Sequence, residues 1–301
     1  MKKPQFAKLV LVSSIALALT ACGSDDDDNN AAPAPTTPPP ASATVGDVVA
    51  LTVSNRLISF DRASPATIRT NVLVTGLQSG ENLVGIDMRP VDGMLYGVGS
   101  TGRLYTLDPV TGAATNKSRL AADAADTTDA FTALAGTNFG VDFNPMADRL
   151  RIVSNTGQSL RINVDTGATT TDGVINRAGA APMVAAAAYT NSILNATTTQ
   201  LFDVDSTSSV LALQNPPNDG TLVNVGPLGV TIAGDGGMDI AGGANGLVLA
   251  ALRTTDGGPT SLYRVDITTG AGTLIGGAAN PAASRIGSGM PGVKDIAIWL
   301  R

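Results

Sequence analysis

The sequence has no histidine, one cysteine and a single glutamate among its 25 acidic residues. The missing histidine excludes Ser-His-Asp and Cys-His nucleophile systems and every metal site that needs imidazole. One cysteine excludes internal disulfides and thiolate clusters, and an aromatic content of 4% argues against surfaces that stack sugars or bases. What the 301 residues do contain is aspartate, 34 glycines and 17 prolines. This composition is typical of short strands joined by tight turns.

The N-terminus has the three parts of an export signal, which we predict over residues 1–21. Three lysines precede the apolar run Leu9–Leu19, and two small residues follow it. The run is shorter than the roughly 20 residues that span a bilayer. Leu19–Cys22 resembles a bacterial lipobox, which predicts cleavage before Cys22 and acylation of its thiol and amino group by chains such as palmitate. The alternative is a chance cysteine at the end of an ordinary signal.

Residues 22–44 are rich in Asp, Pro, Ala and Thr, and we predict a disordered tether because little here can bury apolar surface. The run Asp25–Asp28 is interpreted as a solvated spacer, with a calcium site as the alternative. In Gram-negative lipoproteins, which this segment resembles, Asp directly after the acylated Cys favours the inner membrane. Gly23 stands there instead, so we expect the outer membrane of the cell envelope.

Removal of the signal and its three lysines leaves 16 basic against 25 acidic residues, a net charge of −9. A negative chain of this kind is a poor partner for nucleic acid or for an anionic lipid surface. The membrane is therefore expected to be a partner only through the acyl chains. We expect a monomer whose remaining partner is a protein or small molecule bound on one face of the domain.

Residues 45–301 repeat one pattern of four short alternating strands, which predicts antiparallel four-stranded sheets. Four units are continuous and the fifth is split between the two ends; the units are 83–115, 139–170, 183–225, 237–275, and 48–72 with 293–299. Repeats of about this length with four strands each are typical of propeller blades. The sequence therefore predicts an all-β, five-bladed β-propeller in a single domain. Pairing of the C-terminal strand with the N-terminal strands closes the ring.

An Asp or Asn ends each third strand at spacings of 47, 57, 50 and 51 residues. Such side chains accept hydrogen bonds from amides two residues on, so a structural role at blade corners is predicted. The five residues are Asp61, Asp108, Asp165, Asn215 and Asp266. Residues 121–137, between two units, are predicted to be a surface insertion.

Three stretches resemble the bacterial family known as domain of unknown function 4394, whose members are exported or lipid-anchored. They are LVGIDMRPVDGMLYGVGSTGRLYTLDPVTGAAT, FGVDFNPMADRLRIVSNTGQSLRINVDTGA and QNPPNDGTLVNVGPLGV. The resemblance covers nearly all of the predicted ring. It implies a propeller-like exported domain, and it supplies neither an activity nor functional residues.

The first strand of four units carries an aspartate at an equivalent position, where it would face the central channel; these are Asp87, Asp142, Asp239 and Asp295. The third unit has alanine near position 187. Converging carboxylates repel one another at low dielectric. Three interpretations of these aspartates remain open: hydrogen bonding to amides of the same or the next blade, a bound cation such as Ca²⁺, or acid/base catalysis.

Two functions follow from these features. The first is a lipid-anchored, non-catalytic binding or protein-interaction module, because loops on a rigid ring suit recognition. The alternative is a metal-dependent hydrolase or lactonase-like propeller, in which a channel Ca²⁺ polarises an ester or phosphate. No catalytic residue is assigned, and calcium is the only cofactor considered.

Overall fold

The computed structural model describes residues 44–242, 246–254, 258–290 and 292–299, which belong to one compact unit, Ser42–Arg301. Strands dominate this part of the chain, and short 3-10 turns occur at η1 (Pro217–Asp219), η3 (Pro281–Ser284) and η4 (Ile286–Ser288). None of its helices is long and apolar enough to cross a membrane. Cys22 and most of the predicted tether lie outside the described residues.

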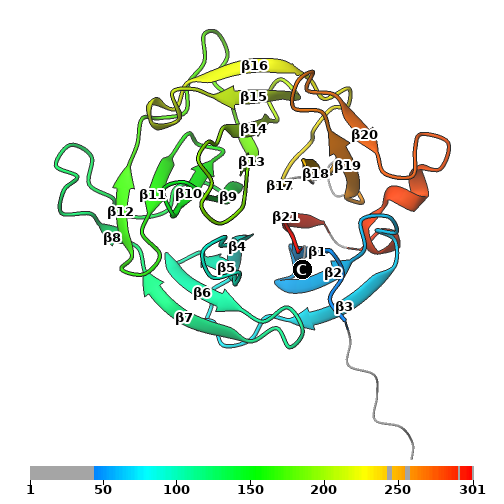
Figure 1. The fold of residues 1–301 in the computed structure, drawn as a ribbon, viewed down its shortest axis with the longest axis horizontal. Coiled ribbons are helices and arrows are strands. Elements are labelled where there is room, and N and C mark those ends of the chain that lie inside the picture. The colour runs from blue at the N-terminus through cyan, green and yellow to red at the C-terminus, as the bar shows by residue number, and fades with distance from the viewer. Residues whose placement is uncertain (1–43, 243–245, 255–257, 291, 300–301) are drawn as a thin grey trace, which may run out of the picture. The chain divides into compact units, whose positions relative to one another are not determined.

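Five antiparallel sheets stand around a common axis, each with its first strand innermost (Figure 1). Blade 1 contains β4 (Leu83–Met88), β5 (Leu95–Gly99), β6 (Arg103–Leu107) and β7 (Ala114–Arg119). Blade 2 contains β9 (Phe139–Asn144), β10 (Arg149–Ser154), β11 (Ser159–Ile162) and β12 (Ala168–Thr171). Blade 3 contains β13 (Val184–Tyr189), β14 (Leu201–Asp205), β15 (Val210–Gln214) and β16 (Leu222–Pro227).

Blade 4 contains β17 (Gly236–Ala241), β18 (Leu247–Leu252), β19 (Ser261–Val265) and β20 (Gly272–Leu274). Blade 5 joins the two ends of the domain: β21 (Val293–Ile298) pairs with β1 (Val48–Thr52), followed by β2 (Arg56–Phe60) and β3 (Ile68–Leu73). In this pairing Val48 lies opposite Ile298 and Leu51 opposite Asp295. The predicted five-bladed propeller and its closure by the C-terminal strand are confirmed.

Blade 2 has one more strand than the repeat predicts. β8 (Ala121–Ala122) pairs in parallel with β12 at the outer edge of the blade. These two residues belong to the segment 121–137 that the sequence presents as an insertion. The insertion therefore begins by extending the neighbouring sheet, and its later part also binds the blade, because Thr171 donates its N–H to Asp126 at 2.9 Å.

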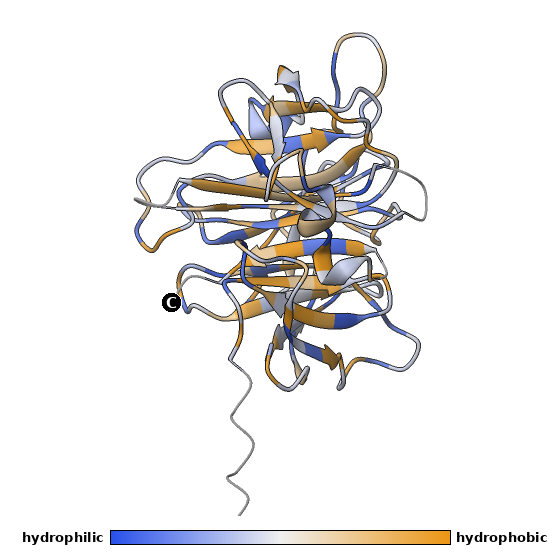
Figure 2. Cartoon of the chain, turned by 90° about the vertical axis from the view of Figure 1, so that its right-hand side faces the viewer, coloured by the Kyte–Doolittle hydropathy of each residue, from blue (hydrophilic) through white to orange (hydrophobic). Residues whose placement is uncertain are grey.

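Apolar side chains fill the seams between blades rather than one central core. Figure 2 shows hydrophobic segments running along the strands. Each of five buried apolar clusters combines residues of adjacent blades; for example, Tyr96 of blade 1 packs edge-on against Phe143 of blade 2, with ring centroids 5.3 Å apart. Alternating strands supply one apolar face to each neighbour, and so the blades stack around the ring.

The outer turns also tie the blades together. Gly112, Gly167 and Gly270 occupy equivalent turns with φ near +80°. A Cβ at any of them would collide with the backbone of the preceding blade's outer strand. Glycine is required here both by the left-handed conformation and by this close approach.

Candidate functional site at the propeller axis

The innermost strands approach closely because glycine precedes aspartate by two residues in three of them. A Cβ on Gly85 would collide with Val141, one on Gly140 with the backbone of β13, and one on Gly237 with the backbone of β21. Residues two apart in a strand lie on the same face. The aspartate that follows each glycine therefore also faces the next blade.

All four predicted channel aspartates are buried, with exposed fractions of 4% or less. Each accepts a hydrogen bond from a backbone N–H of the next blade. The N–H groups donate as follows: Phe143 to Asp87 at 2.7 Å, Tyr189 to Asp142 at 2.9 Å, Ile86 to Asp295 at 2.9 Å, and Ile298 to Asp239. We call these contacts the aspartate latches. They join four of the five seams, and they are one of the arrangements that the sequence left open.

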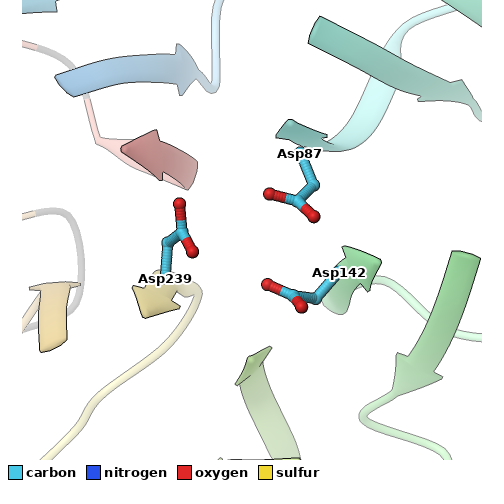
Figure 3. Close-up of side chains that lie close together, drawn as sticks. All are labelled: Asp87, Asp142 and Asp239. Carbon is cyan, nitrogen blue, oxygen red and sulfur yellow. The ribbon is translucent and has the colours of Figure 1, made fainter. Parts of the chain in front are cut away.

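Three of the four carboxyl groups also converge on the axis. Asp87, Asp142 and Asp239 each offer one oxygen, and these oxygens lie within 4.8 Å of one another (Figure 3). Asp295 is not part of this group. In the described part of the chain, no lysine or arginine forms a salt bridge with any of the three.

Burial raises the pKa of every acid in the ring. For Asp239 it raises the pKa to about 6. The pKa values of Asp87 and Asp142 are raised well above their ordinary value by burial first and then by neighbouring carboxylates. Burial also raises the pKa of Asp295, with a smaller contribution from the Asp239 carboxylate. The acids on the axis therefore keep their protons to a higher pH than ordinary carboxyl groups do, and an entering cation would lower their pKa values.

A cavity of about 350 Å³ opens where the inner strands end, and Asp239 is one of its lining residues. Residues from blades 1, 3, 4 and 5 form its wall. The wall includes the side chains of Met88, Arg89, Ile193, Ile240, Ile298 and Trp299. We call this space the axial cavity. At the opposite ends of the inner strands the described residues enclose a space of only about 20 Å³, lined in part by Asp235 and Lys294.

Exposed apolar side chains gather in the loops that follow the inner strands, next to the axial cavity. Val91, Met94, Met146, Ile193 and Leu194 are between 44% and 56% exposed. They come from the first loop of blades 1, 2 and 3, and Ile193 also lines the cavity. Exposed apolar side chains and the axial cavity therefore lie on the same face of the ring, and Ile193 belongs to both.

The guanidinium of Arg89 is the cationic group in the cavity wall, and it is fully paired. It contacts Asp148 at 2.6 Å, Asp165 at 2.8 Å and Asp92 at 3.2 Å, while its side chain is 7% exposed. Arg89 and Lys117 lower the pKa of Asp165 to about 2. Arg89 thus positions the loops of blades 1 and 2 and leaves the charge of Asp239 uncompensated.

The five predicted corner residues take different structural roles. Asp108 and Asp266 accept hydrogen bonds from the amides two and three residues on, as expected. In blade 2 the equivalent turn uses Asn163, which accepts from the N–H of Asp165, because the turn begins two residues earlier. Asp61 pairs with Arg69. Asn215 donates its backbone N–H to Thr221.

Sequence reasoning missed the cavity wall and two buried charged residues, Arg151 and Asp203. The residues just after each inner-strand aspartate would have indicated the wall, since in a propeller these loops surround the axis. Arg151 is 1% exposed, and the side chain of its partner Asp172 is 5% exposed. Nothing in the local sequence indicates that Asp203 is buried, because alternation with apolar neighbours is the only pattern around it.

Comparison with known proteins identifies the family of this chain. No curated protein is detectably similar in sequence. A structural genomics protein of unknown function from Bacteroides thetaiotaomicron VPI-5482 is 16% identical with a TM-score of 0.49; the match covers 85% of this chain and 64% of that chain. The protein from Lactobacillus plantarum is 16% identical with a TM-score of 0.39, covering 83% and 70%.

A chain of a nidogen/laminin complex is 12% identical with a TM-score of 0.44, and the match covers 84% of this chain and 97% of that one. The family model described as "Domain of unknown function (DUF4394)" matches residues 56–286, which is well over half of the sequence. The motifs quoted above lie within that range. This propeller therefore belongs to the DUF4394 family.

Proposed function

We propose that the protein is a non-catalytic binding module of the bacterial cell envelope that takes a small ligand into the axial cavity. The observation that supports this most directly is the cavity itself, which opens among exposed apolar side chains at one end of the inner strands. Contiguous exposed apolar surface on a soluble domain marks binding sites. Concave, mostly apolar sites with a few polar groups are typical of small-molecule recognition.

A neutral fluorescent dye, N-phenyl-1-naphthylamine, tests the proposal. We expect saturable enhancement of its emission by the full chain, and Ile193→Asp should weaken dye binding at least tenfold by placing a charge in the cavity wall. Val174→Asp is the matched control, because Val174 is 64% exposed and lies outside the cavity. Equal weakening by both variants, or dye binding that neither changes, would reject the axial cavity as the site.

We further propose that the module is anchored at the outer membrane through acylated Cys22. The export signal, the lipobox-like residues and Gly23 support this. Cys22→Ser should release the protein from the membrane fraction, since several acyl chains provide the attachment. Retention of the variant in that fraction would contradict the anchor.

The converging carboxylates favour one alternative function, a calcium-dependent hydrolase or lactonase-like enzyme. Asp87, Asp142 and Asp239 offer oxygens of the type that Ca²⁺ prefers, and a bound ion would polarise an ester or phosphate. Thermal unfolding after chelation and again with Ca²⁺ distinguishes this alternative: an ion at 100 times its Kd adds about 2.7 kcal/mol. A shift that the double variant Asp87→Asn, Asp142→Asn abolishes would favour the metal enzyme.

A further inference from the structure

We infer that the axial cavity selects a small organic cation, an ammonium group on an apolar body. This inference rests on the proposed function, because it names the class of ligand for the same cavity. Three features support an organic cation: the side chains of the cavity wall, the balance of charges around the cavity and the spacing of the acids beside it.

The wall favours an apolar ligand body. Met88, Ile193, Ile240 and Ile298 line the cavity together with Trp299. A metal ion alone would leave these side chains in contact with water, whereas an aliphatic body of suitable size would bury them at about 25 cal/mol per Å². An indole ring also attracts a nearby cation through its electron-rich face.

The charge balance favours a cationic head. Asp239 lines the cavity, is 4% exposed and receives only backbone hydrogen bonds. The guanidinium in the cavity wall, on Arg89, already pairs with three carboxylates. A carboxylate buried without a counter-ion gains more from an entering cation than an exposed one does, because solvent screens it less.

The spacing of the acids fits an ammonium group. The Asp87, Asp142 and Asp239 oxygens lie no more than 4.8 Å apart, so one atom in or above their plane can lie about 2.8 Å from all three. Charge-assisted N–H···O hydrogen bonds have this length. A primary ammonium has three N–H donors and no acceptor, and so it can serve all three carboxyl groups at once.

The only tryptophan of the chain lines the cavity, so its emission reports occupancy directly. The probes are three molecules with one body and different heads: cyclohexylmethylamine, cyclohexylmethanol and cyclohexanecarboxylate. Each is titrated at pH 7 into the full-length chain in detergent, with CaCl₂ as a fourth titrant. We expect a saturable change of Trp299 emission with the amine, affinity at least tenfold lower for the alcohol, and no response to the carboxylate.

Asp239→Asn should reduce amine affinity to that of the alcohol, while the asparagine oxygen can still accept from Ile298. Asp295→Asn is the matched control, because it removes a ring acid that is not part of the converging group; it should leave amine affinity unchanged. If Asp239→Asn does not melt cooperatively, Asp87→Asn replaces it with the same expected loss.

Equal affinity for amine and alcohol, unchanged by Asp239→Asn, would overturn the ammonium inference and leave the binding module standing. Displacement of the amine by micromolar Ca²⁺ would overturn it in favour of a metal site. Failure of all three organic probes, together with failure of the dye, would reject the cavity as a binding site altogether.

Discussion

The two sides of blade 3 are held in the ring by different physical means. Its seam with blade 2 contains the smallest of the five buried apolar clusters and a buried polar network. Its seam with blade 4 contains the largest cluster and no aspartate latch among the described residues. Neighbouring blades can therefore be held together either by paired polar groups or by buried apolar area alone.

Arg151 is the centre of the polar seam. Its guanidinium donates to Asp172, to Asn218 at 2.9 Å and to the hydroxyl of Tyr189 at 3.2 Å, with the last two residues belonging to blade 3. The Asp142 latch adds a backbone hydrogen bond across the same seam. Asp203 of β14 is buried near Arg151, and neither of its carboxyl oxygens has a hydrogen-bond partner among the described residues.

The apolar seam has no such groups to satisfy. β13 carries Ala185–Ala188 where three other inner strands carry the glycine and aspartate pair. Phe202 and Val204 of blade 3 pack with Met238 and Leu252 of blade 4. A latch is dispensable here because the buried apolar surface stabilises the contact without leaving a polar group unpaired.

The largest expected effect is a pH dependence that belongs to the polar seam. Burial raises the pKa of Asp203 to about 8, against about 3.9 in an unfolded chain. The folded state therefore keeps a proton that the unfolded state has released. The resulting stability is fully present below about pH 4 and is lost as the pH rises to 8, at about 1.4 kcal/mol per pH unit.

Asp203→Asn removes this titration. Urea unfolding between pH 4 and 9 should show the variant gaining stability relative to the natural chain by several kcal/mol up to pH 8 and by no more beyond it. Asp129→Asn, at an exposed acid, is the control and should show no such trend. Parallel pH curves for Asp203→Asn and the natural chain would show that Asp203 is ionised in the fold.

Breaking the centre of the polar seam is expected to have the next largest effect. Arg151→Met leaves Asp172 buried with one cation fewer and leaves Asn218 unpaired, which should cost about 3–5 kcal/mol of unfolding free energy. Arg149→Met, two residues earlier in the same strand, is the control because Arg149 donates only to backbone carbonyls. Similar urea midpoints for the two variants would contradict the central role of Arg151.

The apolar seam should respond to loss of volume instead of charge. Leu252 is fully buried in its cluster, and Leu252→Ala should cost about 2–5 kcal/mol. Since no charge is involved, the loss should be the same in low and high salt and at pH 5 and pH 8. Val223→Ala, at a half-exposed position on β16, is expected to change stability little. A salt-dependent loss at Leu252 would remove the distinction between the seams.

The smallest expected effect concerns the Asp142 latch, and it distinguishes the contribution of the hydrogen bond from that of the negative charge. Asp142→Ala removes the acceptor for the N–H of Tyr189 and should cost about 1–3 kcal/mol. Asp142→Asn keeps an acceptor oxygen and removes repulsion from Asp87, so its stability should equal or exceed that of the natural chain at pH 7. Equal losses from both substitutions, measured by urea unfolding, would mean that the charge itself stabilises the seam.

Local patterns explain why the propeller could be predicted. Alternation of apolar and polar residues marks each strand, and Asp108 and Asp266 mark turns through contacts with their own neighbours in sequence. The four inner-strand aspartates could be placed because they recur at one point of the repeat. Asp165 is not the corner residue of its blade, because the turn begins at Asn163. Asp165 pairs instead with Arg89 of another blade, and no repeat pattern reports a contact of that kind.

The strand order, the five repeats and the closure by β21 could be predicted from the sequence, because these depend on periodicity and on turn chemistry within each unit. The folded ring was needed to show which acids converge, that Asp295 is outside their group, and that a cavity with Trp299 in its wall opens beside Asp239. It also showed that Arg151 and Asp203 are buried at one seam. The physical reason is that burial and convergence are properties of the space between blades, and that space exists only once the ring has closed.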